Sequence, residues 1–257
     1  MLSESPLKVW LDRDGTLLRL RLARPKANIV DAAMIAALDS SLAEYQNTKE
    51  LRAVLLDHEG PHFSFGASVD EHLPESCADM LKALHSLMRS MLNCPLPLLV
   101  SIKGQCLGGG LEVAAAGSML FAAADAKLGQ PEINLAVFAP AASCLLPERI
   151  GQARAEDLLV SGRSMGAEEA LATGLIDCLA DDPEKAALAY FDKHLAPHSA
   201  STLRFAVSAA REEYRQRVFA KLERVETLYL DELMKTHDAV EGLKAFLEKR
   251  QAQWQDR

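Results

Sequence analysis

The stretch GQCLGGGLEVAAAG, residues 104–117, constrains the fold more than any other part of the chain. It follows an apolar run, LPLLVSIKG, that predicts a strand, and it leads into residues that favour a helix. Glycine weakens helices and strands alike, so the three glycines at 108–110 indicate a tight turn between the two. Glu112 stands among apolar neighbours, and a glutamate is seldom fully buried unless it is paired. Together these choices indicate a functional site.

The glycine turn is suited to holding a developing negative charge. Backbone N–H groups at a helix N-terminus point outward with partial positive charge, and glycines let a ligand approach them closely. Such groups can stabilise an oxyanion. The turn lacks the spacing of a P-loop, of a dinucleotide-binding loop and of a nucleophile elbow. The same residues are equally consistent with a turn that only packs a strand closely against a helix.

Two further segments favour a catalytic site. FSFGAS, residues 63–68, is a second turn of small residues after a buried strand. LGQPEI, residues 128–133, presents Glu132 directly after a proline. If Glu112 and Glu132 face each other, their environments should separate their pKa values and give one base and one acid. The alternative for Glu132 is an ordinary surface turn.

Composition excludes several other classes. The 257 residues carry a net charge of −8 and show no basic stripe, so nucleic acid is an unexpected partner. The five scattered cysteines indicate a reducing cytoplasm without disulfides or a zinc site. Neither a signal pattern nor an apolar run of membrane-spanning length is found. The histidines show no metal-ligand spacing, so no metal is expected and most histidines are expected at the surface or in packing.

Strands alternate with helices over about the first 180 residues, which predicts an α/β body, and the chain then becomes purely helical. We place the boundary at 195, giving a core of 1–195 and a helical region of 196–257. The alternation in LLRLRLA, residues 17–23, predicts a half-exposed strand. Ser164 is the expected N-cap of a helix that ends at Gly174. LIDCLA, after that helix, is expected to be a strand.

These segments, in this order, resemble the crotonase (enoyl-CoA hydratase/isomerase) superfamily over nearly the whole chain. RPKAN matches its N-terminal CoA-contacting loop, FSFGAS its first oxyanion loop, KGQCLGGGLEVAAAG its second, and LGQPEI its acid-bearing segment. The resemblance implies an α/β spiral of ββα turns and a C-terminal helical region that assembles a homotrimer or a dimer of trimers. It also implies an acyl-CoA substrate, with coenzyme A as part of that substrate and no separate cofactor.

The resemblance also assigns residues. It implies an oxyanion hole made by the N–H groups of Ala67 and Gly109, and catalysis by Glu112 and Glu132. Glu112 is expected to be the base, because the helix dipole favours its ionised form, and Glu132 the protonated acid. The CoA-binding residues implied by position are listed together: Lys26, Ala27, Phe65, Gly66 and Val69.

Departures from the family pattern narrow the expected reaction. Ser68 replaces a residue that family hydratases usually carry in the first oxyanion loop, and Pro61 replaces a basic residue commonly found before that loop, at a phosphate contact. APAASCLLP, residues 139–147, replaces a glycine-rich segment. That segment should reshape the acyl pocket at Pro140, Ala141 and Cys144. The chain looks most like hydratases that add water to a conjugated cyclic dienoyl-CoA in anaerobic aromatic (benzoyl-CoA) degradation. The alternatives are a short-chain enoyl-CoA hydratase, an enoyl-CoA isomerase and a non-catalytic binding subunit.

Overall fold

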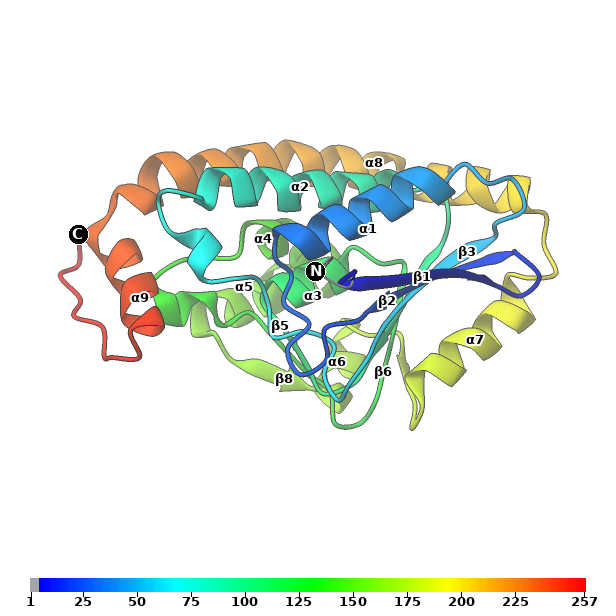
Figure 1. Ribbon diagram of the computed structural model, residues 1–257, viewed down its shortest axis with the longest axis horizontal. Helices are drawn as coiled ribbons and strands as arrows, with labels where there is room; N and C mark the ends of the chain where they lie inside the picture. Colours follow the sequence, from blue (N-terminus) through cyan, green and yellow to red (C-terminus); the bar gives the residue numbers. More distant parts are fainter. Residues whose placement is uncertain (1–4) are drawn as a thin grey trace.

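Two β-sheets form the centre of the protein in the computed structural model, which describes residues 5–257 (Figure 1). The larger sheet has six strands in the order β1-β2-β3-β4-β6-β9, with β1 antiparallel to β2 and the other pairs parallel. The smaller sheet has the order β5-β7-β8. The strands are β1 (Leu7–Asp12), β2 (Leu17–Leu22), β3 (Ala53–His58), β4 (Leu98–Ile102), β5 (Gln105–Leu107), β6 (Met119–Ala122), β7 (Lys127–Gly129), β8 (Ser164–Gly166) and β9 (Cys178–Leu179).

Helices pack on both faces of the larger sheet. They are α1 (Ala32–Tyr45), α2 (Cys77–Asn93), α3 (Gly109–Ala115), α4 (Pro140–Ile150), α5 (Gln152–Ser161), α6 (Ala167–Thr173), α7 (Pro183–His194), α8 (Ala200–Thr227) and α9 (His237–Leu247). The short 3-10 helices η1 (Asp70–His72), η2 (Pro131–Leu135) and η4 (Leu233–Lys235) and the π-helix η3 (Leu228–Glu232) lie between them. Local capping fixes several starts, as where the Asp31 carboxylate accepts from the Met34 N–H at the start of α1.

The chain winds as ββα units that alternate between the two sheets. β4 lies in the larger sheet, β5 follows in the smaller sheet, and α3 then begins. The next unit repeats this pattern with β6, β7 and η2 before α4. The parallel pairing of β5 with β7 brings the turn after each of them to one edge, which places residues 108–110 beside residues 130–132.

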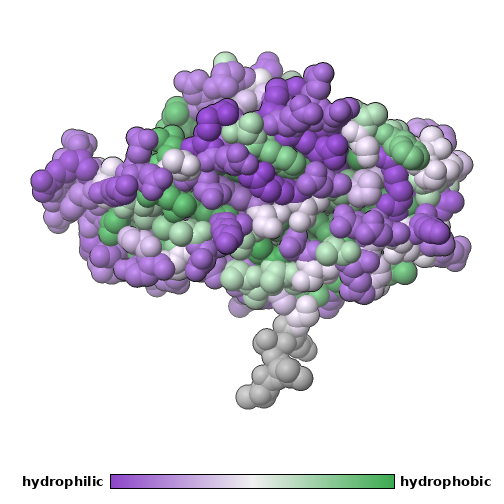
Figure 2. All heavy atoms as spheres, turned by 90° about the horizontal axis from the view of Figure 1, so that it is seen from above, coloured by the Kyte–Doolittle hydropathy of each residue, from purple (hydrophilic) through white to green (hydrophobic). Residues whose placement is uncertain are grey.

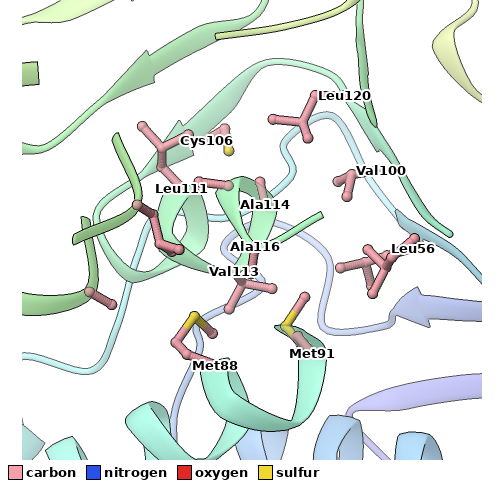
Figure 3. Packing of buried hydrophobic residues seen from close by; sticks show 14 of the residues in the cluster. Leu56, Met88, Met91, Val100, Cys106, Leu111, Val113, Ala114, Ala116 and Leu120 are labelled. Carbon is pink, nitrogen blue, oxygen red and sulfur yellow. The ribbon is translucent and has the colours of Figure 1, made fainter. Parts of the chain in front are cut away.

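The core explains the alanine run after the glycine turn. All seven residues of α3 are buried. Met88 and Met91 of α2 reach toward Val113 and its alanine neighbours, while strand residues close the opposite side (Figure 3). Glycines and alanines make up four of its seven residues, so α3 can pack closely inside the molecule.

Two local expectations are wrong. The strand of residues 17–22 is buried rather than half-exposed, since Arg19 is 3% exposed and pairs with Asp57 and Glu184 from distant segments. Ser164 belongs to β8 rather than to a helix cap, because Met165 pairs with Leu128 and α6 begins only at Ala167. The predicted stop at Gly174 is confirmed. Of LIDCLA, only Cys178–Leu179 pairs as a strand.

The helical tail packs largely on its own chain. α8 runs alongside α2 on one face of the molecule (Figure 1), and the Arg211 guanidinium donates to the Cys94 carbonyl at 3.1 Å. Val218 and Leu222 join the main core, whereas Phe205 remains 75% exposed. Seen from above, the surface is mainly hydrophilic with separate apolar patches (Figure 2). Within residues 5–257 no helix is long and apolar enough to cross a bilayer. The boundary at 195 stays a prediction.

Candidate active site

The two predicted turns lie against each other. The Ser64 carbonyl accepts from the Leu107 N–H at 3.0 Å, which joins the loop of residues 63–68 to β5. A Cβ added to Gly109 would lie 3.0 Å from the Ala67 Cβ and 3.1 Å from the Ala67 nitrogen. A Cβ on Gly110 would lie 2.5 Å from that of Ser64. The glycines are therefore required for two backbones to meet, and the contact brings the N–H groups of Ala67 and Gly109 to one place.

These two N–H groups are available to a ligand. Neither donates to an acceptor within the described part of the chain, although the neighbouring Gly66 N–H donates to Ser64 Oγ at 3.1 Å. Gly109 opens α3, where the first N–H groups have no partner within the helix. Ala67 and Gly108 both line a cavity of about 440 Å³. The arrangement suits two donors on one oxygen atom.

Glu112 lies behind this turn and is almost completely buried. It is 3% exposed, and its Oε1 accepts from the Ala142 N–H at 2.8 Å. Burial raises the pKa of Glu112 from 4.5 to about 7, while the N–H groups of Ala142 and Ala141 act in the opposite direction. The pKa is therefore raised overall, although the helix dipole was expected to favour the ionised form, and the role of Glu112 as the base stays a prediction. The hydrogen bonds that favour the ionised form come from the first turn of α4, not from α3.

Glu132 lies in the first turn of η2 and borders the cavity. Burial and the nearby charge of Glu112 raise its pKa to about 8. The charge of Glu112 therefore reaches Glu132, and the pKa of each carboxyl group is raised toward neutral pH. Gly108 has a φ of +50°, which favours glycine, and a Cβ there would lie 2.6 Å from Glu132 Oε1 and displace that carboxyl group.

Apolar side chains form most of the cavity wall. The lining residues are Phe65, Gly66, Ala67, Val69, His72, Gly108, Pro131, Glu132, Asn134, Leu135, Val137, Leu243 and Phe246. Within residues 5–257 no group of three or more His, Cys, Asp or Glu side chains is placed to hold a metal ion. A largely apolar space with one acidic edge and two free N–H donors fits an uncharged acyl group whose carbonyl develops negative charge.

Comparison with known proteins agrees with this geometry. The sequence profile described as enoyl-CoA hydratase/isomerase matches residues 12–257. The chain belongs to the enoyl-CoA hydratase/isomerase family. It is 69% identical over 255 residues to a cyclohexa-1,5-dienecarbonyl-CoA hydratase of Thauera aromatica, covering 99% of each chain. It is also 32% identical to a probable enoyl-CoA hydratase of Bacillus subtilis (strain 168), over 91% of this chain and 93% of that one.

The fold comparison gives the same family. A solved enoyl-CoA hydratase/isomerase from Pseudoalteromonas atlantica T6c superposes with a TM-score of 0.85 at 26% identity, covering 97% of this chain and 99% of that chain. The predictions of a crotonase-type α/β fold and of a hydro-lyase are thereby confirmed. The comparisons do not favour the short-chain hydratase, isomerase or binding-subunit alternatives.

Within this hydratase-family fold, the predicted CoA-binding residues fall into two groups. Phe65, Gly66 and Val69 line the cavity. Lys26 and Ala27 lie in the adjoining loop, where the Ala27 carbonyl accepts from the Phe65 N–H at 2.9 Å. Lys26 is exposed and has a φ of +93°. Their roles in binding stay predictions.

The predicted acyl pocket at Pro140, Ala141 and Cys144 needs correction. All three residues are buried in α4, and none of them is among the residues that line the cavity. The first turn of α4 lies behind Glu112 and supplies its hydrogen bonds, while Cys144 borders a separate hollow beside Lys221 and Arg224. The altered segment therefore contacts Glu112 rather than the wall of the cavity.

Sequence reasoning missed several residues of the wall. His72 was expected at the surface or in packing, but it borders the cavity, with its Nδ1 2.7 Å from the Ser68 carbonyl. Burial lowers the pKa of His72 and keeps the ring neutral. Leu243 and Phe246 come from α9, more than a hundred residues after Glu132. Their apolar spacing is that of any amphipathic helix, so no local signal could have identified them.

Proposed function

We propose that this protein is a hydratase that converts cyclohexa-1,5-diene-1-carbonyl-CoA to 6-hydroxycyclohex-1-ene-1-carbonyl-CoA in anaerobic aromatic degradation. The observation that carries the proposal is Glu132 on the wall of an apolar cavity, with Glu112 buried behind it and two unpartnered N–H groups beside them. Water addition needs a base and an acid on one water molecule. The likeness to the Thauera aromatica hydratase supports the choice of substrate.

The reaction proceeds through an enolate. The thioester oxygen accepts from the N–H groups of Ala67 and Gly109, and ionised Glu112 removes a proton from water as its oxygen bonds to the β-carbon of the ring. The electron pair of the C1=C2 bond moves into the thioester carbonyl and extends through the C5=C6 bond. Glu132 then donates its proton to C5, so the remaining double bond joins C1 to C6. Renumbering the ring gives the 6-hydroxy-1-ene product, with one water added and no redox change.

The protonation states are part of the proposal. Burial raises the pKa of both carboxyl groups toward neutral pH, so the pair can hold one proton there, and we assign that proton to Glu132. Hydration should therefore decline below about pH 7, where Glu112 is protonated, and above about pH 8, where Glu132 loses its proton. Removing one donor of an oxyanion hole typically slows a reaction ~10²–10³-fold, so both N–H groups contribute substantially.

The rest of the proposal concerns the setting of the enzyme. We propose that exposed Lys26 contacts the CoA phosphates, because an acidic protein needs a local positive charge to hold them. We place the enzyme in the cytoplasm, in keeping with its five free cysteines. We also propose a homotrimer or a dimer of trimers assembled through residues 196–257, where Phe205 and Leu228 leave apolar surface exposed. Coenzyme A enters as part of the substrate, and no separate cofactor is required by the steps above.

A substrate comparison tests this function. Purified protein is assayed with cyclohexa-1,5-diene-1-carbonyl-CoA and with crotonyl-CoA, following the loss of the conjugated chromophore. We expect a higher kcat/KM for the cyclic diene. A clear preference for crotonyl-CoA would assign the protein to the short-chain hydratases, and double-bond migration without water uptake would assign it to the isomerases. Mass spectrometry in H₂¹⁸O distinguishes these outcomes, since only hydration incorporates the label.

A further inference from the structure

The imidazole ring of His72 has one nitrogen bound within the protein and one that remains an acceptor. The ring borders the cavity from η1, shortly after the loop that carries Ala67. Its Nδ1 lies 2.7 Å from the Ser68 carbonyl oxygen, and a carbonyl oxygen can only accept, so Nδ1 carries the proton. In a neutral imidazole the other nitrogen, Nε2, is then an acceptor. Burial lowers the pKa of His72, which favours this neutral form.

The Nε2 atom of His72 makes no hydrogen bond within residues 5–257, where the only partner of the ring is the Ser68 carbonyl. The unpartnered nitrogens His58 Nδ1 and His85 Nε2 are enclosed by protein, whereas Nε2 of His72 keeps accessible surface. His72 as a whole is only partly exposed, and its ring borders the cavity. The lone pair therefore faces space that a ligand can fill.

The cavity wall offers few other side-chain acceptors. Among the described lining residues, polar side chains belong to His72, Glu132 and Asn134. Asn134 is exposed, so water can satisfy its amide, and Glu132 is the proposed acid. The Tyr229 hydroxyl is also unpartnered, but it is fully enclosed and does not line the cavity. His72 is therefore the acceptor that an otherwise apolar wall holds ready for a donor on the acyl group.

Water addition creates a donor of this kind. The acyl group of the diene carries no hydrogen-bond donor. The added water brings two protons, of which Glu112 removes one, and the other stays on the new hydroxyl group. An O–H group in an apolar cavity costs free energy unless an acceptor meets it. The lone pair of His72 Nε2 is an acceptor that this hydroxyl group can use.

We propose that His72 is a specificity-determining residue whose Nε2 accepts a hydrogen bond from the hydroxyl group on the β-carbon of the hydrated acyl-CoA. The site thereby distinguishes a β-hydroxyacyl group from an acyl group that lacks this donor. In the reverse reaction the same hydrogen bond selects the hydroxylated compound as the substrate. The ring of His72 gains and loses no proton in these steps. The proposal rests on the proposed function for the identity of the ligand.

Nuclear magnetic resonance of protein labelled with ¹⁵N-histidine detects both the tautomer and the hydrogen bond. The signals of His72 are assigned by their loss in His72→Phe, or in His72→Gln if the first variant does not fold. In the free wild-type protein we expect a protonated Nδ1 and an unprotonated Nε2. The Nε2 signal should move upfield, as for a hydrogen-bonded lone pair, with the equilibrium mixture of the diene and its hydroxylated product. It should stay in place with benzoyl-CoA, which has the same CoA part but no hydroxyl group on its ring.

Two inhibition constants, both measured in the hydration direction, test the selectivity. We expect His72→Phe to weaken inhibition by the hydroxylated product about tenfold, the size of one hydrogen bond lost from a buried group. Inhibition by benzoyl-CoA should stay nearly constant, because phenylalanine keeps an aromatic ring in the wall. His194→Phe, at an exposed histidine on α7, is the matched control and should leave both constants as in wild type.

Three results would overturn the role of His72. A protonated Nε2 in the free protein removes the acceptor, without the need for a functional variant. An Nε2 signal that moves equally with benzoyl-CoA places the donor in the CoA part of the ligand. Inhibition constants for the product and for benzoyl-CoA that rise together in His72→Phe mean that the residue only shapes the wall.

Failure of the proposed substrate is a separate result, because it appears as absent turnover of the cyclic diene by the wild-type protein. The comparison is then made with 3-hydroxybutyryl-CoA and butyryl-CoA, which again differ by one hydroxyl group on the β-carbon. An upfield shift of the Nε2 signal with the hydroxylated member alone supports the role of His72. No shift with either member overturns it.

Discussion

Replacing Glu112 with glutamine should make the protein more stable at alkaline pH while removing most of its activity. Burial raises the pKa of this carboxyl group from 4.5 to about 7. Between these values the folded chain binds more protons than the unfolded chain, so stability falls as pH rises and stays low above pH 7. At about 1.36 kcal/mol per pKa unit, the ionised carboxylate costs about 3 kcal/mol of the free energy of unfolding at pH 8.5.

Glutamine removes this cost without removing the local hydrogen bond. Its side-chain oxygen can still accept from the Ala142 N–H, which otherwise would be left unsatisfied. We therefore expect Glu112→Gln to exceed wild type by up to about 3 kcal/mol at pH 8.5, with little difference near pH 4.5. Its kcat should fall ~10²–10⁴-fold, the range of lost acid–base catalysis.

The change in the free energy of unfolding is measured by urea unfolding followed by circular dichroism. The measurement is made at pH 5 and at pH 8.5, at equal protein concentration. Glu148→Gln is the matched control on α4, because its pairing with Arg217 lowers the pKa of Glu148. The stabilisation from this ion pair is present at alkaline pH and is lost as pH falls. Glu148→Gln should therefore be less stable than wild type at pH 8.5. A Glu112→Gln protein that gains nothing at pH 8.5 would refute the reasoning that burial of the ionised base costs stability.

Four further predictions concern the site and the tail. Glu112→Gln and Glu132→Gln should each lower kcat ~10²–10⁴-fold with nearly constant KM, and the double variant should be little worse than the worse single one; fully multiplied losses would mean independent action. Lys26→Ala should raise KM for acyl-CoA with little change in kcat, and an unchanged KM would remove Lys26 from the site. Gly108→Ala should inactivate the enzyme in steady-state assays, since its Cβ would lie 2.6 Å from Glu132 Oε1; full activity would contradict the placement of the acid. Truncation after residue 195 should give aggregated chain on size-exclusion chromatography, because α8 and α9 cover the core and the cavity, whereas a soluble, active monomer would contradict this.

Features set by neighbouring residues were predictable from the sequence. Gly108 fixes the turn before α3, because few other residues adopt its φ of +50°. Gly174 ends α6 for the same kind of reason, with a φ of +82°. The two small-residue turns and the position of Glu112 in its helix are local facts, and the structure has them where the sequence indicates.

Features that depend on distant partners were not predictable. Arg19 looked like an exposed strand residue because its partners Asp57 and Glu184 are far away in sequence. Serine is a residue type that favours helix N-caps, but the segment that contains Ser164 pairs with β7 as a strand. Propensity describes only what a segment prefers alone, and pairing with another segment overrides it.

The chemistry divides in the same way. The sequence by itself showed that this chain has two candidate carboxylates, Glu112 and Glu132, and two turns of small residues, and it showed their order. Only the tertiary structure decided the pKa values of these carboxyl groups, because desolvation depends on everything packed around them. The Ala142 N–H of α4 donates to Glu112, and the Gln130 side chain contacts the carboxyl group of Glu132. It also decided that α9 closes the cavity. Covalent neighbours fix backbone conformation, whereas pKa values and cavity walls are set by segments that meet only when the chain folds.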